Sequence, residues 1–178
     1  MRLGVAIGAA IALLVAPLAA AQVDPGRLVL RGSDVPSGFR LDSGVSGVRT
    51  NAMESRAPVV RRLIARSGRT TGYQSRFDNE KRAIRSRADL FRRPGGARLF
   101  LEFFDEEMRK GGIAGLVRLR VRVGAGGWLY TGRSVAAFVL VVWRHDRVFG
   151  GLMTTGLSRA RTIALARAQQ RRIAAALR

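Results

Sequence analysis

The chain has 178 residues, in which 32 lysines and arginines outnumber 12 acidic residues, so its formal net charge is +20. It contains no cysteine and one histidine. These counts exclude disulfides, thiol catalysis, iron–sulfur clusters and zinc sites built from thiolates or several histidines. The positive charge favours anionic partners but does not specify a fold.

Residues 1–21 have the layout of a secretory signal peptide. Arg2 carries a positive charge, residues 3–16 are continuously apolar, and Pro17 is followed by an A-x-A cleavage pattern that ends at Ala21. An uncleaved membrane anchor is the alternative, because residues 3–21 are just long enough to span a bilayer. We therefore expect a signal peptide at 1–21 and one domain at 22–178, secreted or held in the periplasm or cell envelope after cleavage near Ala21-Gln22.

In the first half of the mature chain, the sequence pattern predicts turns, a short strand and a helix, followed by a β-hairpin. Residues 24–47 are rich in glycine, serine, proline and aspartate, which favours turns and one short strand. Pro58 suits the first turn of a helix that Gly68 ends. Alternating residues then predict strands at 72–78 and 82–91 with a tight loop between them.

The second half contains two long periodic helices separated by strands. An apolar stripe predicts a helix over 94–110, and Ser158 is the expected N-cap of a final helix that extends to Leu177. The strands predicted between them are 117–123, 128–131, 135–143 and 148–155. Short turns between consecutive strands indicate an α+β fold, a mainly antiparallel sheet packed by two to three helices.

Catalytic and metal-binding patterns are weak in this sequence. His145 precedes Asp146, but adjacent residues do not form a catalytic relay. Glu102, Asp105 and Glu106 form an acidic helix face, which could serve a hydrolase or simply be solvated. No glycine-rich nucleotide loop lies between a strand and a helix. We therefore assign no catalytic residue, no metal ligand and no cofactor.

The sharpest pattern is a row of arginines. Arg118, Arg120 and Arg122 alternate with apolar residues, so in a strand they project from one face about 6.6–6.8 Å apart. Arg85 and Arg87 extend this row if their strand lies in the same sheet and faces the same way. Such a row faces solvent, pairs with carboxylates such as Asp89 and the acidic helix, or binds an anion. We therefore hypothesise that these five arginines form an anion-binding site.

Aromatic residues supply a hypothetical pocket. Trp128 follows a glycine-rich turn, which favours a place near a pocket mouth, and Tyr130 lies on the same predicted strand. Phe100 and Phe104 form a stripe on the central helix, which suits either the core or a ligand pocket.

Several segments resemble small exported actinobacterial-type envelope proteins. They are Asp34–Phe39, Gly124–Thr131, the run from Val141 to Val148, and the helix that ends at Gln169–Ile173. The proteins that they resemble include lipoproteins with a PsbP-like α/β/α sandwich and the extracellular sensor domains of bacterial Ser/Thr kinases. The resemblance implies a non-enzymatic envelope module that binds a ligand between sheet and helix.

Three functions remain open from the sequence. The first is an exported binding module for an anionic or amphipathic ligand, such as an anionic lipid or a wall polymer. The second is a hydrolase of wall polymers that uses the helix carboxylates, and the third is a basic domain that docks an acidic protein. Export makes intracellular nucleic acid an unfavourable partner, and the sequence does not specify an oligomeric state.

The mature protein is expected to begin at Gln22, because Ala19 and Ala21 satisfy the signal peptidase and Pro17 ends the apolar helix before them. Mass spectrometry of the exported protein should show the loss of residues 1–21. Recovery of the full-length chain in membranes would support the anchor instead.

Overall fold

The computed structural model describes residues 23–54 and 57–178, so the predicted signal peptide lies outside the described residues. The α-helices in these ranges are α1 (Pro58–Ser67), α2 (Pro94–Lys110) and α3 (Arg159–Ala176), and the 3-10 turns are η1 (Pro25–Leu28), η2 (Gly32–Asp34) and η3 (Asn51–Met53). The strands are β1 (Arg40–Leu41), β2 (Gly47–Arg49), β3 (Arg69–Asn79), β4 (Arg82–Phe91), β5 (Ala114–Val121), β6 (Gly127–Arg133), β7 (Ala137–His145) and β8 (Val148–Thr155).

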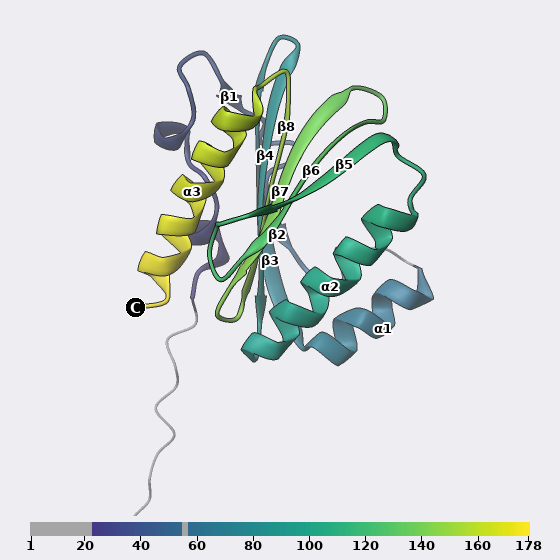
Figure 1. Ribbon diagram of the computed structural model, residues 1–178. Coiled ribbons are helices and arrows are strands. Elements are labelled where there is room, and N and C mark those ends of the chain that lie inside the picture. The colour runs from purple at the N-terminus through teal and green to yellow at the C-terminus, as the bar shows by residue number, and fades with distance from the viewer. Residues whose placement is uncertain (1–22, 55–56) are drawn as a thin grey trace, which may run out of the picture.

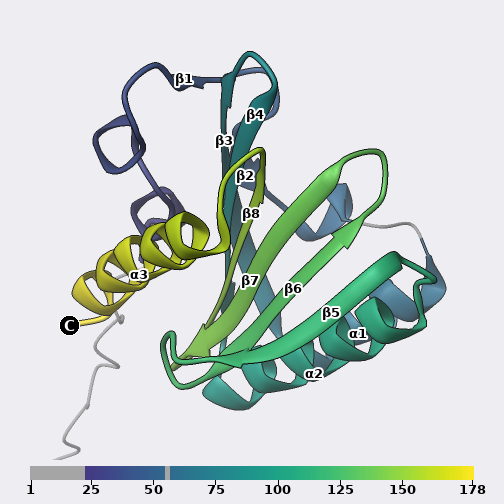
Figure 2. The ribbon, with the colours of Figure 1, turned by 45° about the horizontal axis from the view of Figure 1, so that its top comes forward.

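The strands form one antiparallel sheet with helices on both faces. Its order is β1-β3-β4-β8-β7-β6-β5, and β2 also pairs with β3. α2 packs on one face, whereas α3 and η1 pack on the other, and α1 contacts α2 (Figures 1 and 2). None of the helices in the described ranges is long and apolar enough to cross a membrane. The expected α+β fold, with a mainly antiparallel sheet and two to three helices, is confirmed.

The long periodic elements agree with the sequence pattern, and the short ones differ. α2 has the predicted bounds, and the Ser158 hydroxyl caps α3 by accepting a hydrogen bond from the Arg161 amide. β2 was not predicted, because three residues are too few to show alternation. β7 begins at Ala137 instead of Val135, whose side chain is fully exposed in the preceding turn. An apolar run alone could not separate that turn from the strand.

Trp143 organises the core on the α3 face of the sheet. Its side chain is fully buried, and its indole donates a hydrogen bond of 2.7 Å to the Gln170 side chain on α3. Its cross-strand partners are Gly127 and Gly150. A methyl group on Gly150 would lie 2.5 Å from the indole, so this glycine makes room for the ring.

Aromatic side chains fill the core on the α2 face. The Phe100 ring lies 5.4 Å from that of Phe91 and 5.2 Å from that of Phe149, measured between centroids. Phe104 also contacts Phe149, at 5.8 Å. These contacts fix α2 on β4 and β8, and they thereby set the position of every side chain that α2 presents to the sheet.

Replacing Trp143 with alanine should lower the free energy of unfolding by about 3–5 kcal/mol, because it leaves a cavity beneath α3. Urea denaturation followed by circular dichroism would measure the change. Trp128→Ala is the matched control and should cost less, since Trp128 is only partly buried. Equal stability of Trp143→Ala and the wild type would show that the assigned core is wrong.

Candidate functional site

The predicted arginines share one face of the sheet but form two groups. The register joins Arg120, Trp128, Val142, Gly151 and Arg87 in one cross-strand row. A second row joins Arg118, Tyr130, Leu140, Met153 and Arg85. Residues in one row face the same side, which is the side covered by α2. Three strands separate the two groups, so they lie about 19 Å apart at the usual strand spacing.

The group on β5 is held by a carboxylate and an indole. Arg118 donates two hydrogen bonds to Asp105 of α2, at 2.6 and 2.7 Å. The guanidinium carbons of Arg118 and Arg120 lie 3.1 and 3.8 Å from the centre of the Trp128 ring. Both guanidiniums thus contact the same indole, and each contact is a favourable cation–π interaction. Arg122 is exposed just beyond the end of β5.

Asp105 is a structural anion in this arrangement. It is buried, and the Tyr130 hydroxyl donates a further hydrogen bond to it at 2.5 Å. Burial alone would raise the pKa of Asp105, but the hydrogen bonds from Arg118 and Tyr130 outweigh it and hold the pKa below its ordinary value. Burial and the bond to Asp105 raise the pKa of Tyr130. The carboxyl therefore stays ionised and paired.

Arg87 is also neutralised within the protein. Its guanidinium donates to Asp89 at 2.7 Å and contacts Glu54 at 3.0 Å. Asp89 is fully buried and accepts a second arginine, Arg69, from β3. The positive charge of Arg87 is thus matched by carboxylates in the described part of the chain.

Arg85 differs from its neighbours, because no carboxylate of the described residues pairs with it. The side chain of Arg85 is exposed at the groove margin, but desolvation by its surroundings, together with the positive charges of Arg76 and Arg49, lowers the pKa of Arg85 from its ordinary value. Arg76 itself is engaged, because its guanidinium donates to Asp78 at 2.9 Å. Arg85 is therefore a cation without an internal carboxylate partner, and the positive charges around it favour an added anion.

Arg85 and Arg87 border an apolar groove between α2 and the sheet. Its volume is about 170 Å³, and Phe104 of α2 forms one wall. The floor consists of residues from β7 and β8, which are Leu140, Val142, Phe149, Gly151 and Met153. Gln74 of β3 lies at the margin. The guanidinium of Arg85, which has no carboxylate partner, thus lies beside an apolar surface.

The predicted pocket residues are divided between this groove and the core. Phe104 lines the groove, whereas Tyr130 is fully buried and Phe100 packs between Phe91 and Phe149. Trp128 lies with the β5 arginines instead. The floor residues of β8 were not anticipated, because Gly151 and Met153 carry no chemical signal. Only the pairing of β8 with β4 places them beside Arg85.

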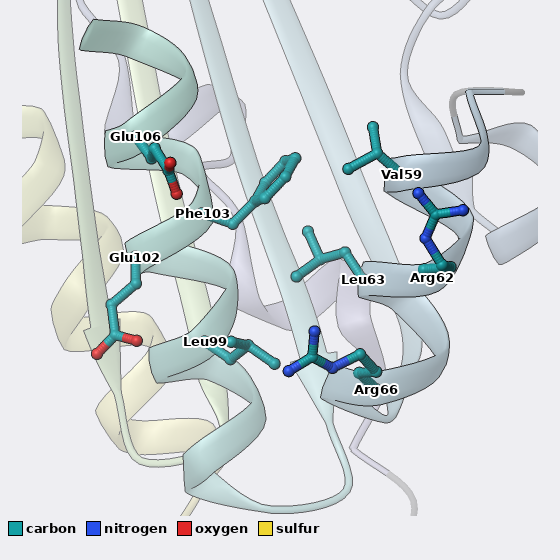
Figure 3. Close-up of a pocket in the computed structure, with 8 residues that line it drawn as sticks. All are labelled: Val59, Arg62, Leu63, Arg66, Leu99, Glu102, Phe103 and Glu106. Atoms are coloured by element: carbon teal, nitrogen blue, oxygen red, sulfur yellow. The ribbon is translucent and has the colours of Figure 1, made fainter. Parts of the chain in front are cut away.

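The acidic face of α2 lines a different cleft, shown in Figure 3. This cleft of about 330 Å³ lies between α1 and α2, and Val59, Leu63, Leu99 and Phe103 form its apolar part. Glu102 and Glu106 line the α2 side, and arginines Arg62 and Arg66 of α1 line the other. Glu102 pairs with Arg98 and Glu106 with Lys110, each within α2. The two carboxylates thus lie on one helix, whereas glycosidases oppose theirs across a cleft.

The described residues form neither a metal site nor a catalytic histidine–aspartate pair. They contain no group of three or more histidine, aspartate or glutamate side chains placed to hold a metal ion. His145 ends β7, and Asp146 begins the tight turn to β8 with a positive φ of 48°. His145 and Asp146 therefore belong to the β7–β8 hairpin and do not form a catalytic pair.

Comparisons with known proteins give a match at the level of fold. No family model and no curated protein matches the chain. The chain is similar to the crystal structure of the extracellular domain of PknH from Mycobacterium tuberculosis, with 12% sequence identity and a TM-score of 0.54. The match covers 83% of this chain and 94% of that one. It agrees with the resemblance to kinase sensor domains seen in the sequence, and at this identity it establishes the architecture alone.

Replacing Asp105 with asparagine should destabilise the fold, because Arg118 loses a charged acceptor worth about 1.5–3 kcal/mol. The folded-state pKa of Asp105 lies below that of the unfolded chain. Its contribution is therefore present above the unfolded pKa, near 4, and is lost as the pH falls through the folded value.

Urea denaturation between pH 3 and pH 7 tests this expectation. The gap in unfolding free energy between the wild type and Asp105→Asn should narrow towards acid pH. Glu106→Gln, an exposed carboxylate on the same helix, is the control and should change stability little at neutral pH. A gap that is independent of pH would contradict the assigned role of Asp105.

Proposed function

We propose that this protein is an exported, non-enzymatic binding module of the cell envelope that holds an anionic ligand with an apolar part in the Arg85 groove. The observation that carries the proposal is the unpaired guanidinium of Arg85 at the margin of an apolar groove. Arg76 and Arg87 beside it are already paired with carboxylates. An anion at Arg85 would form charge-assisted hydrogen bonds without competing with an internal partner.

The composition of the chain supports the same class of ligand. The net charge of +20 attracts polyanions at long range, and the predicted export signal places the protein among envelope phosphates. Phospholipids present an anionic headgroup next to acyl chains, whereas wall polymers built on glycerol phosphate present the anion without an apolar chain. The fold shared with an extracellular domain is compatible with this setting.

The hydrolase hypothesis has less support. Asp105 is held ionised by Arg118, and Glu106 is bonded to Lys110, whose hydrogen bond lowers the pKa of this exposed carboxyl. A general acid needs a raised pKa near the working pH. The protein-docking hypothesis also has less support, because apolar hollows interrupt the described surface.

Binding of poly(glycerol phosphate) should weaken with salt, because neutralising phosphates releases counterions. Arg85→Gln should lower affinity and flatten the slope of log affinity against log salt by roughly one unit, borrowing the nucleic-acid value. Arg61→Gln, an exposed arginine of α1, is the charge-matched control. Isothermal titration at several salt concentrations, repeated with phosphatidylglycerol vesicles, measures both slopes and separates polymer from lipid.

The β5 arginines are tested in the same titration. Arg120→Gln with Arg122→Gln removes two charges but leaves the Arg118–Asp105 bonds in place. The Arg85 proposal expects this double variant to bind nearly as well as Arg61→Gln. If the double variant alone loses the salt dependence, the anion lies on β5 and the groove assignment is wrong.

A further inference from the structure

A larger cavity lies on the opposite face of the sheet, between β3 and the N-terminal segment. Its volume is about 390 Å³, within the range of small-molecule sites. Its lining is mainly apolar and comes from the residues after η1, the residues around β1, and β3: Val29, Leu30, Phe39, Leu41, Tyr73 and Phe77. The hydroxyl of Ser75 is already bonded to the Leu30 carbonyl, so it offers no free donor there.

Aliphatic side chains surround this cavity and stay in contact with solvent. Leu41 is 55% exposed and Val48 is 49% exposed. The register places Leu41 beside Phe77 and Val48 beside Tyr73, so both lie on the face that contains the cavity. β1 and β2, which carry these residues, are two and three residues long. An apolar ligand that covered them would remove exposed hydrocarbon from water.

An arginine cluster adjoins the cavity. Arg31 lines both the apolar cavity and a second hollow of about 210 Å³, which is also bordered by Arg27 and Arg172. Asp34 accepts from the Arg172 side chain and from the Arg31 backbone amide. The Nε of Arg172 is nevertheless buried without a hydrogen-bond partner. Within the described residues, the guanidiniums of Arg27 and Arg31 have no carboxylate partner.

We infer that this region is a second binding site, independent of the Arg85 groove, for a single-chain amphiphile with an anionic head. The aliphatic chain occupies the apolar cavity and covers Leu41, and the head contacts Arg31 and Arg27. The cavity alone would accept an uncharged chain, and the arginines alone would accept a small anion. Their junction at Arg31 selects a molecule that carries both.

Gly32 allows the cavity to be blocked without disturbing the core. It lines the cavity, and a Cβ added to it would meet no atom within 4 Å. A phenylalanine at this exposed rim position meets no steric clash at Cβ, and Gly32→Phe should obstruct the space that the chain occupies. Gly95 in the first turn of α2 has an equally open Cβ position but lies outside the cavity, so Gly95→Phe is the matched control.

The test is titration of the mature protein with laurate, with dodecanol as the same chain without charge. Gly32→Phe should weaken laurate binding at least tenfold, and Gly95→Phe should not. Arg27→Gln with Arg31→Gln should weaken laurate roughly tenfold, the effect of one charged hydrogen bond, and leave dodecanol unchanged. Arg85→Gln should leave intact the laurate binding that Gly32→Phe weakens, and any laurate binding that Arg85→Gln alone removes belongs to the groove, which separates the two sites.

Three results would overturn the inference. They are absence of laurate binding by the wild type, equal binding by Gly32→Phe and the wild type, and loss of binding in Arg85→Gln alone. Thermal unfolding of each variant accompanies the titrations. If Gly32→Phe does not fold, Gly32→Leu replaces it, since leucine fills less of the same space and should still weaken laurate.

Discussion

The buried carboxylate of Asp89 is the interaction on which both the fold and the proposed groove depend. It accepts hydrogen bonds from Arg69 on β3 and from Arg87 on its own strand, and the side chains of Arg69 and Asp89 are completely buried. Removing one partner of such a cluster leaves a buried charge, which typically costs about 3–5 kcal/mol. Gly72 fits the cluster, because a Cβ there would lie 2.4 Å from the Asp89 carboxylate.

The same cluster orders the chain before α1 and decides which arginine is free. Arg69 also binds the Asn51 side chain and the Glu54 carboxylate, which ties η3 and Glu54 to β3. Since Asp89 and Glu54 are committed to Arg69 and Arg87, neither carboxylate is left for Arg85. In a chain with 12 acidic and 32 basic residues, a few shared carboxylates determine where positive charge stays uncompensated.

Local sequence pattern predicted the long elements, but it did not predict the groove that brings Arg85, Arg87 and Phe104 together. α2 shows an apolar stripe over many turns, α3 begins at a clear serine N-cap, and the 82–91 strand alternates, so local pattern was sufficient for these elements. That Arg85 and Arg118 share a face depends on β4 pairing with β8, a contact between residues far apart in the chain. The distance between the two arginine groups depends on strand order, which local periodicity does not encode. The N-terminal cavity was missed for a similar reason, because an irregular N-terminal segment without periodicity forms one of its walls against β3.

The arginines of β5 also affect how one molecule meets another. β5 forms an edge of the described sheet, where unpaired backbone groups can template pairing with a second chain. Its other side exposes Val117 and Leu119, which would favour such pairing. Two copies brought together along this edge would place Arg118 and Arg120 against like charges, which is unfavourable. Since Asp105 offsets the charge of Arg118, the positive charge of Arg120 is the part of the row that disfavours edge-to-edge pairing, whether or not the row ever contacts a ligand.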